Sequence, residues 1–216
     1  GYSYEYIYIF KKMISEKFSK KHLIIFGTNL LDSKSGKFYN SMLAINSNFE
    51  IIQSYNKRKL VPFGEFLPFE KFLNNFGLKK ITEGHGSFLK GNKNKNLQID
   101  NINILPLICY EVIFTDLIQK SSKGTNLIVN ISEDGWFGKS IGPNQHFAKS
   151  IFRAIENDTF FLRSTNQGVS AIIDNKGNII KQLDWNEAGN IEFEVPLINS
   201  NKTKNDLIFF ILLITY

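Results

Sequence analysis

Short, nearly uninterrupted apolar runs constrain the fold of this chain more than any other feature. The segments His22–Thr28 and Leu127–Ile131 are of this kind, and such strands need cover on both faces of their sheet. The same reading predicts further strands at Phe38–Ile45, Ile51–Tyr55, Asn101–Ile108, Phe160–Ser164, Val169–Ile173, Asn178–Leu183 and Ile191–Val195. With a few helices among them, these strands predict a layered α/β domain.

Two segments have the apolar spacing of an amphipathic helix, Phe10–Lys20 and Gln145–Asp158. The apolar positions of the first are Met13, Ile14 and Phe18. In the second, Arg153 and Glu156 lie three residues apart on one face, which favours a structural ion pair over a catalytic one.

Turn residues and one proline refine the strand prediction. Asn46–Asn48 separates two strands, and Asn175-Lys176-Gly177 is typical of a hairpin turn. Pro106 lies inside a predicted strand and has no N–H to donate, so we expect an edge position or a bulge there.

Composition narrows the classes of function. The 216 residues suffice for one domain with a buried core, and the net charge is +6. The lysines are scattered through polar loops such as Lys90–Asn96 and form no basic helix, so nucleic-acid binding is not predicted. The chain has a single cysteine, and His22, His85 and His146 are widely spaced, so neither a disulfide nor a metal site is expected.

The last ten residues, Leu207–Tyr216, are almost entirely apolar. As a helix they would extend about 15 Å, half of the roughly 30 Å hydrocarbon core of a bilayer. They fit either a buried core helix or the first part of a membrane span, and Asp206 would cap either.

Cys109 follows a predicted strand, where a nucleophile is often presented. A lone cysteine after an apolar run is more often a small core residue, so its neighbours in the sequence decide the interpretation. A cysteine nucleophile also needs a base and a donor to the oxyanion.

An ordered series of short motifs surrounds this cysteine. In chain order they are Tyr55-Asn56-Lys57, Leu60-Val61-Pro62-Phe63-Gly64-Glu65, Cys109-Tyr110-Glu111, Trp136-Phe137-Gly138, Gly142-Pro143, Gln145-His146, Arg153-Ala154 with Glu156, and Thr165-Asn166 with Gly168. The series resembles the nitrilase (carbon–nitrogen hydrolase) superfamily and, within it, the bacterial apolipoprotein N-acyltransferases. The resemblance extends from about Gly27 to Val195.

The resemblance implies a four-layer α-β-β-α sandwich and a Glu–Lys–Cys triad. It assigns the nucleophile to Cys109, the triad lysine to Lys57 and a further acidic residue to Glu65. A lysine ammonium beside a thiol favours the thiolate and can then hold the oxyanion. Supporting positions are Tyr110, Glu111, Trp136 and Phe137.

The two acidic residues near these motifs leave alternatives open. Glu65 could orient Lys57 or relay protons, or it could be an ordinary loop carboxylate. Glu111 could act directly in catalysis or serve as a buried partner of a basic residue.

One motif of the family is absent. Its triad glutamate belongs to a Trp-Pro-Glu segment, which does not occur in this sequence, and neither Glu5 nor Glu16 is expected to replace it. We therefore expect residues 1–200 to form a carbon–nitrogen hydrolase domain without its first strand, and residues 201–216 to begin an apolar helix. The chain would then be a fragment, a split product or a remnant.

The function implied by the resemblance is acyl transfer from a phospholipid, through a cysteine thioester, to the N-terminal cysteine amine of a lipoprotein. It implies no cofactor and places the site on the periplasmic side of the bacterial inner membrane. An apolar mouth would be lined by Phe63, Phe66, Leu67, Phe69, Trp136 and Phe137. The alternatives are a soluble nitrilase-type amidase and a catalytically inactive remnant.

Overall fold

The computed structural model describes residues 4–69, 87–92, 96–121 and 124–198. Its elements, with η for a 3-10 helix, are α1 (Tyr4–Lys17), β1 (Ile24–Leu31), β2 (Phe38–Ile45), β3 (Ile51–Asn56), β4 (Leu97–Ile99), β5 (Ile102–Ile108), η1 (Cys109–Ile113), α3 (Thr115–Ser121), β6 (Leu127–Glu133), η2 (Asp134–Phe137), α4 (Gly142–Asn157), β7 (Phe161–Asn166), β8 (Ser170–Ile173) and β9 (Ile179–Leu183).

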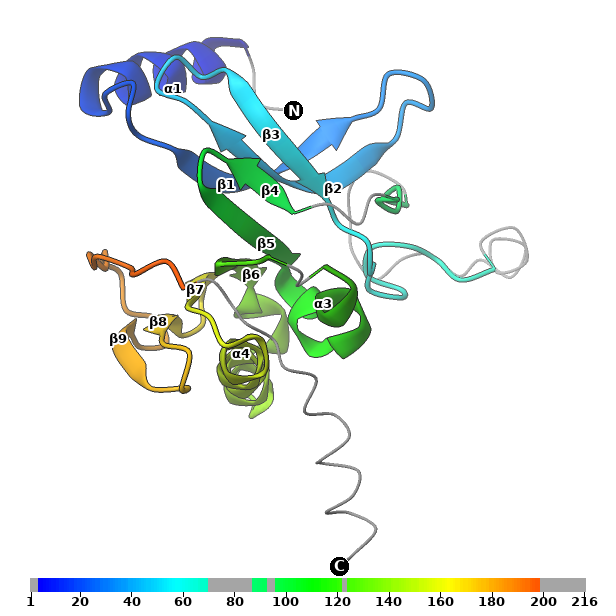
Figure 1. The fold of residues 1–216 in the computed structure, drawn as a ribbon. Coiled ribbons are helices and arrows are strands. Elements are labelled where there is room, and N and C mark those ends of the chain that lie inside the picture. Colours follow the sequence, from blue (N-terminus) through cyan, green and yellow to red (C-terminus); the bar gives the residue numbers. More distant parts are fainter. Residues whose placement is uncertain (1–3, 70–86, 93–95, 122–123, 199–216) are drawn as a thin grey trace, which may run out of the picture.

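The strands form two sheets that face each other. The smaller sheet has the order β1-β2-β3 and is antiparallel, and the larger has the order β4-β5-β6-β7-β8-β9. Within the larger sheet β5, β6 and β7 are parallel, while the outer pairs are antiparallel. In Figure 1, α1 lies on the side of the smaller sheet, and α3 and α4 lie beyond the larger one. The layers thus follow the predicted α-β-β-α order.

Both faces of the larger sheet are covered, as its apolar strands require. The cluster between the sheets contains Met42, Ala44, Tyr55, Leu97, Ile104, Ile108, Leu127, Val129, Phe160 and Ile172. The cluster beneath α3 and α4 contains Leu105, Leu107, Val112, Leu117, Ile118, Ile128, Ala154, Phe161, Ala171 and Ile173. Burying each large apolar side chain contributes roughly 1.5–3 kcal/mol, so these two clusters hold the layers together.

Pro106 lies where β5 has a described partner on one side only. The β4 ladder covers Ile102–Ile104, whereas Pro106 is opposite Val129 of β6. Because the β4 side is already open at this point, the missing N–H interrupts no pairing with β4. The predicted edge position is correct for this residue, although β5 as a whole lies inside the sheet.

The predicted strand at Ile191–Val195 is wrong, since residues 191–198 join no ladder. Ile191 and Val195 pack against the cluster between the sheets, and Phe193 stacks on Phe160 with ring centroids 6.1 Å apart. The segment therefore uses its apolar side chains for packing against the core without pairing with a strand edge.

Helix α1 begins earlier than predicted and ends at Lys17, so Phe18 lies just beyond it. Met13 and Phe18 are 44% and 39% exposed, whereas Ile14 is half-buried. No helix in the described part of the chain has the length and apolarity to cross a bilayer. The segment Leu207–Tyr216 lies outside the described residues.

Candidate active site

Cys109 lies at the turn from β5 into η1 and has an unusual backbone conformation. Its φ is +50°, in the left-handed region, which costs a residue with a Cβ roughly 1–2 kcal/mol. The side chain is a partly exposed free thiol. A strained, accessible residue at the end of a parallel strand is a typical position for a nucleophile.

Lys57 follows the last residue of β3, in the other sheet, and is almost completely buried. Its side chain is 1% exposed, and its Nζ lies 2.8 Å and 2.9 Å from the two carboxylate oxygens of Glu65. Its main chain is anchored as well, because its N–H donates to Asn40 O at 2.8 Å and its carbonyl accepts from Gly91 N at 2.8 Å. The ammonium is therefore held at one place.

Glu65 is fixed in turn by its own loop and by β2. Its Oε1 accepts a hydrogen bond from Asn40 Nδ2 at 2.7 Å, and its Oε2 accepts one from Val61 N at 2.8 Å. Together with Lys57 these donors hold both carboxylate oxygens. Of the interpretations left open by the sequence, this geometry fits a carboxylate that orients Lys57.

Glu111 joins the two halves of the site and is completely buried. It accepts hydrogen bonds from Ile108 N at 2.9 Å, Arg58 N at 2.7 Å, Lys59 N at 3.1 Å and Tyr55 Oη at 2.9 Å. Burial raises the pKa of Glu111, and these hydrogen bonds oppose that rise.

This contact set, called here the Glu111 clamp, binds the residue after Lys57 and the residue before Cys109 to one carboxyl group. The lysine and the cysteine come from different sheets, and the clamp brings their backbones together. Its partners are mainly backbone N–H groups, so the geometry fits a structural role for Glu111 better than a direct catalytic one.

The aromatic residues predicted near the site differ in exposure. Tyr110 packs edge to face on Phe114 at 5.0 Å between centroids. Trp136 is 64% exposed and Phe63 46% exposed, whereas Leu67 is buried. Leu67 therefore presents almost none of its side chain to solvent.

A polar network at the base of the site was not predicted as functional. Asp134 Oδ2 accepts from Arg163 Nη2 at 2.6 Å, and Asp134 Oδ1 lies 3.0 Å from His146 Nδ1. Burial raises the pKa of Asp134, but hydrogen bonds from His146 and Ser132 and the charge of Arg163 outweigh it, so the pKa lies below its usual value. The motif series contained His146, but no pattern in the sequence indicated its partners.

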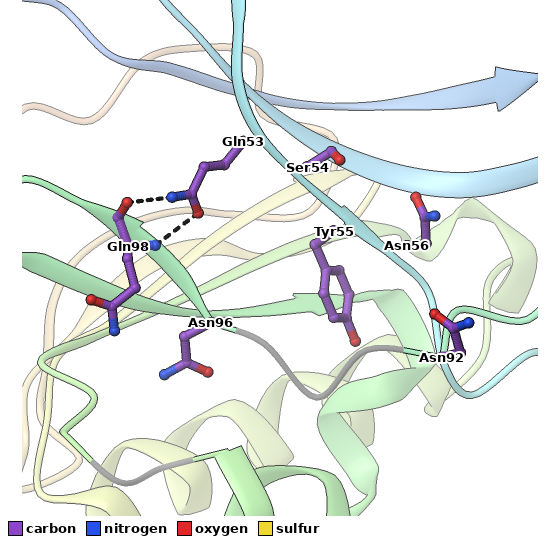
Figure 2. A pocket seen from close by; sticks show the side chains of 7 residues that line it. All are labelled: Gln53, Ser54, Tyr55, Asn56, Asn92, Asn96 and Gln98. Atoms are coloured by element: carbon purple, nitrogen blue, oxygen red, sulfur yellow. Dashed lines mark hydrogen bonds between the residues drawn. The ribbon is translucent and has the colours of Figure 1, made fainter.

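The helix pair Arg153–Glu156 is present, with Nη2 2.6 Å from Oε1, as its spacing predicted. A separate pocket of about 370 Å³ runs along β3, lined among the described residues mostly by amide side chains. Figure 2 shows two hydrogen bonds between Gln53 and Gln98, which join β3 to β4 at this pocket: Gln53 Nε2 donates to the Gln98 carbonyl, and Gln53 Oε1 accepts from the Gln98 N–H. Its described lining shares Tyr55 with the clamp and includes none of Lys57, Glu65 and Cys109.

Comparison with known proteins assigns the family. The family model for carbon–nitrogen hydrolases matches residues 14–205, and the chain therefore belongs to this family. Similar solved structures include Nit3 of Saccharomyces cerevisiae, a nitrilase superfamily member, with a TM-score of 0.62, 19% identity and coverage of 82% of this chain and 62% of that one. The glutamine-dependent NAD+ synthetase of Acinetobacter baumannii gives a TM-score of 0.63 at 16% identity, covering 85% of this chain and 33% of that one. These structures support the nitrilase-like fold.

Several similar curated proteins are named apolipoprotein N-acyltransferase. The protein of Rhodopseudomonas palustris is 41% identical over 73% of this chain, and that of Rickettsia typhi is 40% identical over 74%. The protein of Brucella melitensis is 38% identical over 76% of the chain. The chain spans about a third of the length of these relatives, 30% to 32%.

Proposed function

We propose that this chain carries the catalytic cysteine domain of an apolipoprotein N-acyltransferase. Cys109 would take an acyl chain from a phospholipid and pass it to the α-amine of a lipoprotein's N-terminal cysteine, on the periplasmic side of the bacterial inner membrane. The observation that carries the proposal is the joining of the buried Lys57–Glu65 pair to a left-handed Cys109 by one buried carboxyl group. The names of the curated relatives support the choice of reaction.

The acyl transfer has two chemical steps. In the first, the thiol gives its proton to a base, and the sulfur attacks the ester carbonyl of the phospholipid. The resulting oxyanion then collapses to a thioester, while the departing lysophospholipid alkoxide takes up a proton. In the second, the amine attacks the thioester, loses a proton and releases the thiol. Lys57 supplies the positive charge for the oxyanion of both steps, and Glu65 holds that charge in place.

In the family motif a glutamate supplies the base for the first step, and no Trp-Pro-Glu segment occurs in this sequence. The thiolate is the nucleophile, and alkaline solution favours it over the thiol without the help of a protein base. We therefore expect an acyl adduct on Cys109 in alkaline buffer, and at neutral pH only if a described group serves as base.

The test is incubation of the chain with vesicles of phosphatidylethanolamine and phosphatidylglycerol, followed by intact-mass and peptide mass spectrometry. Lys57→Met is expected to reduce the adduct at least tenfold, a loss of about 1.4 kcal/mol or more in the transition state. Lys37→Met, at an exposed lysine, is the matched control and should react like the parent chain. No adduct at either pH would refute the proposal, and hydrolysis of short amides without an adduct would favour the soluble amidase.

A further inference from the structure

A buried cluster of charged side chains lies directly behind Cys109 and has no part in the reaction described so far. It consists of Asp134 at the start of η2, His146 on α4 and Arg163 on β7, each less than 5% exposed. We call it the Asp134–His146–Arg163 cluster. Burying such groups is costly unless each one is paired, so their arrangement calls for a specific role.

The link from this cluster to the nucleophile is one hydrogen bond. His146 Nε2 lies 3.2 Å from the carbonyl oxygen of Cys109. Because a carbonyl oxygen only accepts hydrogen bonds, Nε2 must carry the hydrogen. The charged ring meets this requirement, and so does the neutral tautomer that carries its hydrogen on Nε2.

The opposite side of the ring is held by the other two members. Nδ1 lies 3.0 Å from Asp134 Oδ1 and 3.1 Å from Arg163 Nη2, while Arg163 Nη2 also donates to Asp134 Oδ2 at 2.6 Å. Phe137 packs on the imidazole with centroids 5.4 Å apart. The ring therefore has contacts that fix both its position and its tilt.

The cluster is tied to the core strands as well. Arg163 Nη1 donates to Asn130 Oδ1 and, at 3.3 Å, to Ser150 Oγ. Asn130 Nδ2 in turn donates to Leu107 O at 3.0 Å, two residues before the cysteine. His146 thus acts on the Cys109 carbonyl from a frame that includes β5, β6, β7 and α4.

We propose that His146 is a positioning residue for Cys109. Its Nε2–H holds the carbonyl of the cysteine, while the Glu111 clamp holds the N–H of the preceding residue. One contact holds the peptide unit that follows the left-handed residue and the other holds the Leu107–Ile108 peptide unit before it, and together they aim the thiol at the substrate carbonyl. The role as a positioner in acyl transfer rests on the proposed function, but the effect on the thiol itself does not.

The decisive comparison is His146→Gln against His146→Asn. A glutamine amide reaches the place of Nε2 and can donate to the Cys109 carbonyl, whereas an asparagine amide reaches only the place of Nδ1. Since the chain has one cysteine, native-state alkylation by iodoacetamide reports on Cys109 alone. His22→Asn, at an exposed histidine, is the control, and circular dichroism verifies that each variant is folded.

We expect His146→Asn to slow alkylation about tenfold. This is a modest effect, because a displacement of reacting groups by about 1 Å can lower a rate by roughly a hundredfold. His146→Gln should remain within about threefold of the parent rate, since one retained hydrogen bond accounts for most of such an effect. Equal rates for the two variants, or a faster rate for His146→Asn, would overturn the proposal.

The phospholipid assay then separates this inference from the proposed function. An acyl adduct on the parent chain that forms equally well on His146→Asn would refute the positioning role and leave the function intact. Absence of the adduct on the parent chain, with the alkylation difference preserved, would refute the function and leave the role of His146 in place.

Discussion

The Glu111 clamp makes a sharp prediction for Glu111→Gln, because two physical effects oppose each other there. Burial raises the pKa of Glu111, which means that the charged form is penalised and that a neutral side chain avoids this penalty. Against this, each partner in the clamp except Tyr55 is a backbone N–H, and a side-chain amide has only one accepting atom.

The hydrogen bonds decide whether Glu111→Gln raises or lowers the stability of the fold. In its best orientation glutamine keeps its oxygen at Oε1, where Arg58 N, Lys59 N and Tyr55 Oη donate. Its NH2 group then faces Ile108 N, which donates to Oε2 at 2.9 Å in the parent. The glutamine NH2 group and the Ile108 N–H are both donors, so the N–H loses its acceptor. A buried N–H without an acceptor lowers the stability of the fold by about 1–3 kcal/mol. A protonated glutamate avoids this conflict because its second oxygen still accepts.

We therefore expect Glu111→Gln to lose about 2 kcal/mol at neutral pH, which corresponds to roughly 4–8 °C in Tm for a chain of this size. Urea unfolding followed by circular dichroism measures the change. Glu50→Gln, at an exposed carboxylate that accepts from Asn46 Nδ2, should change stability by less than about 0.5 kcal/mol. A Glu111→Gln protein as stable as its parent would show that desolvation outweighs the clamp.

Three further changes test the neighbouring contacts. The pKa of Asp134 lies below its usual value. The ionised carboxylate therefore stabilises the fold fully at pH values above the usual pKa, and this contribution is lost as the pH falls through the lowered pKa. Asp134→Asn should flatten the acid side of a stability–pH curve measured by urea unfolding. Gly168→Ala would place a Cβ 2.5 Å from Asp134 Oδ2, and we expect a loss of about 1–3 kcal/mol by the same assay, with Gly189→Ala, whose Cβ would meet only the Leu183 side chain, as the milder control. Tyr55→Phe removes one donor to Glu111 and should cost about 1–2 kcal/mol; no loss in thermal unfolding would contradict a role for Tyr55 in the clamp.

Local patterns in the sequence predicted most of the larger strands. The prediction for Phe38–Ile45 coincides with β2, and the apolar run from Leu127 begins β6. Such strands are predictable from the sequence because burial on both faces of the sheet leaves no position for a polar residue. The strand β4 was missed because it has three residues, Leu97–Ile99, at the end of a polar loop. Ile191–Val195 has strand composition but packs without pairing.

The candidate site shows a similar division. Lys57, Glu65 and Cys109 were found through ordered motifs, and the structure places Glu65 on Lys57. The partners of Glu111 lie up to 56 residues away, and those of His146 lie on three separate elements. Contacts of this kind arise only when the layers pack, so a single sequence without that packing contains no sign of them.

Because the lysine comes from the smaller sheet and the cysteine from the larger, the distance between the sheets is also a dimension of the site. Packed sheets lie about 10 Å apart, a gap set by the side chains that fill it. Ala44 is fully buried in that layer. The size of its side chain helps to set the distance between the sheets and therefore how the lysine and the cysteine are aligned. Core residues far from the thiol can therefore alter its chemistry as well as the stability of the fold.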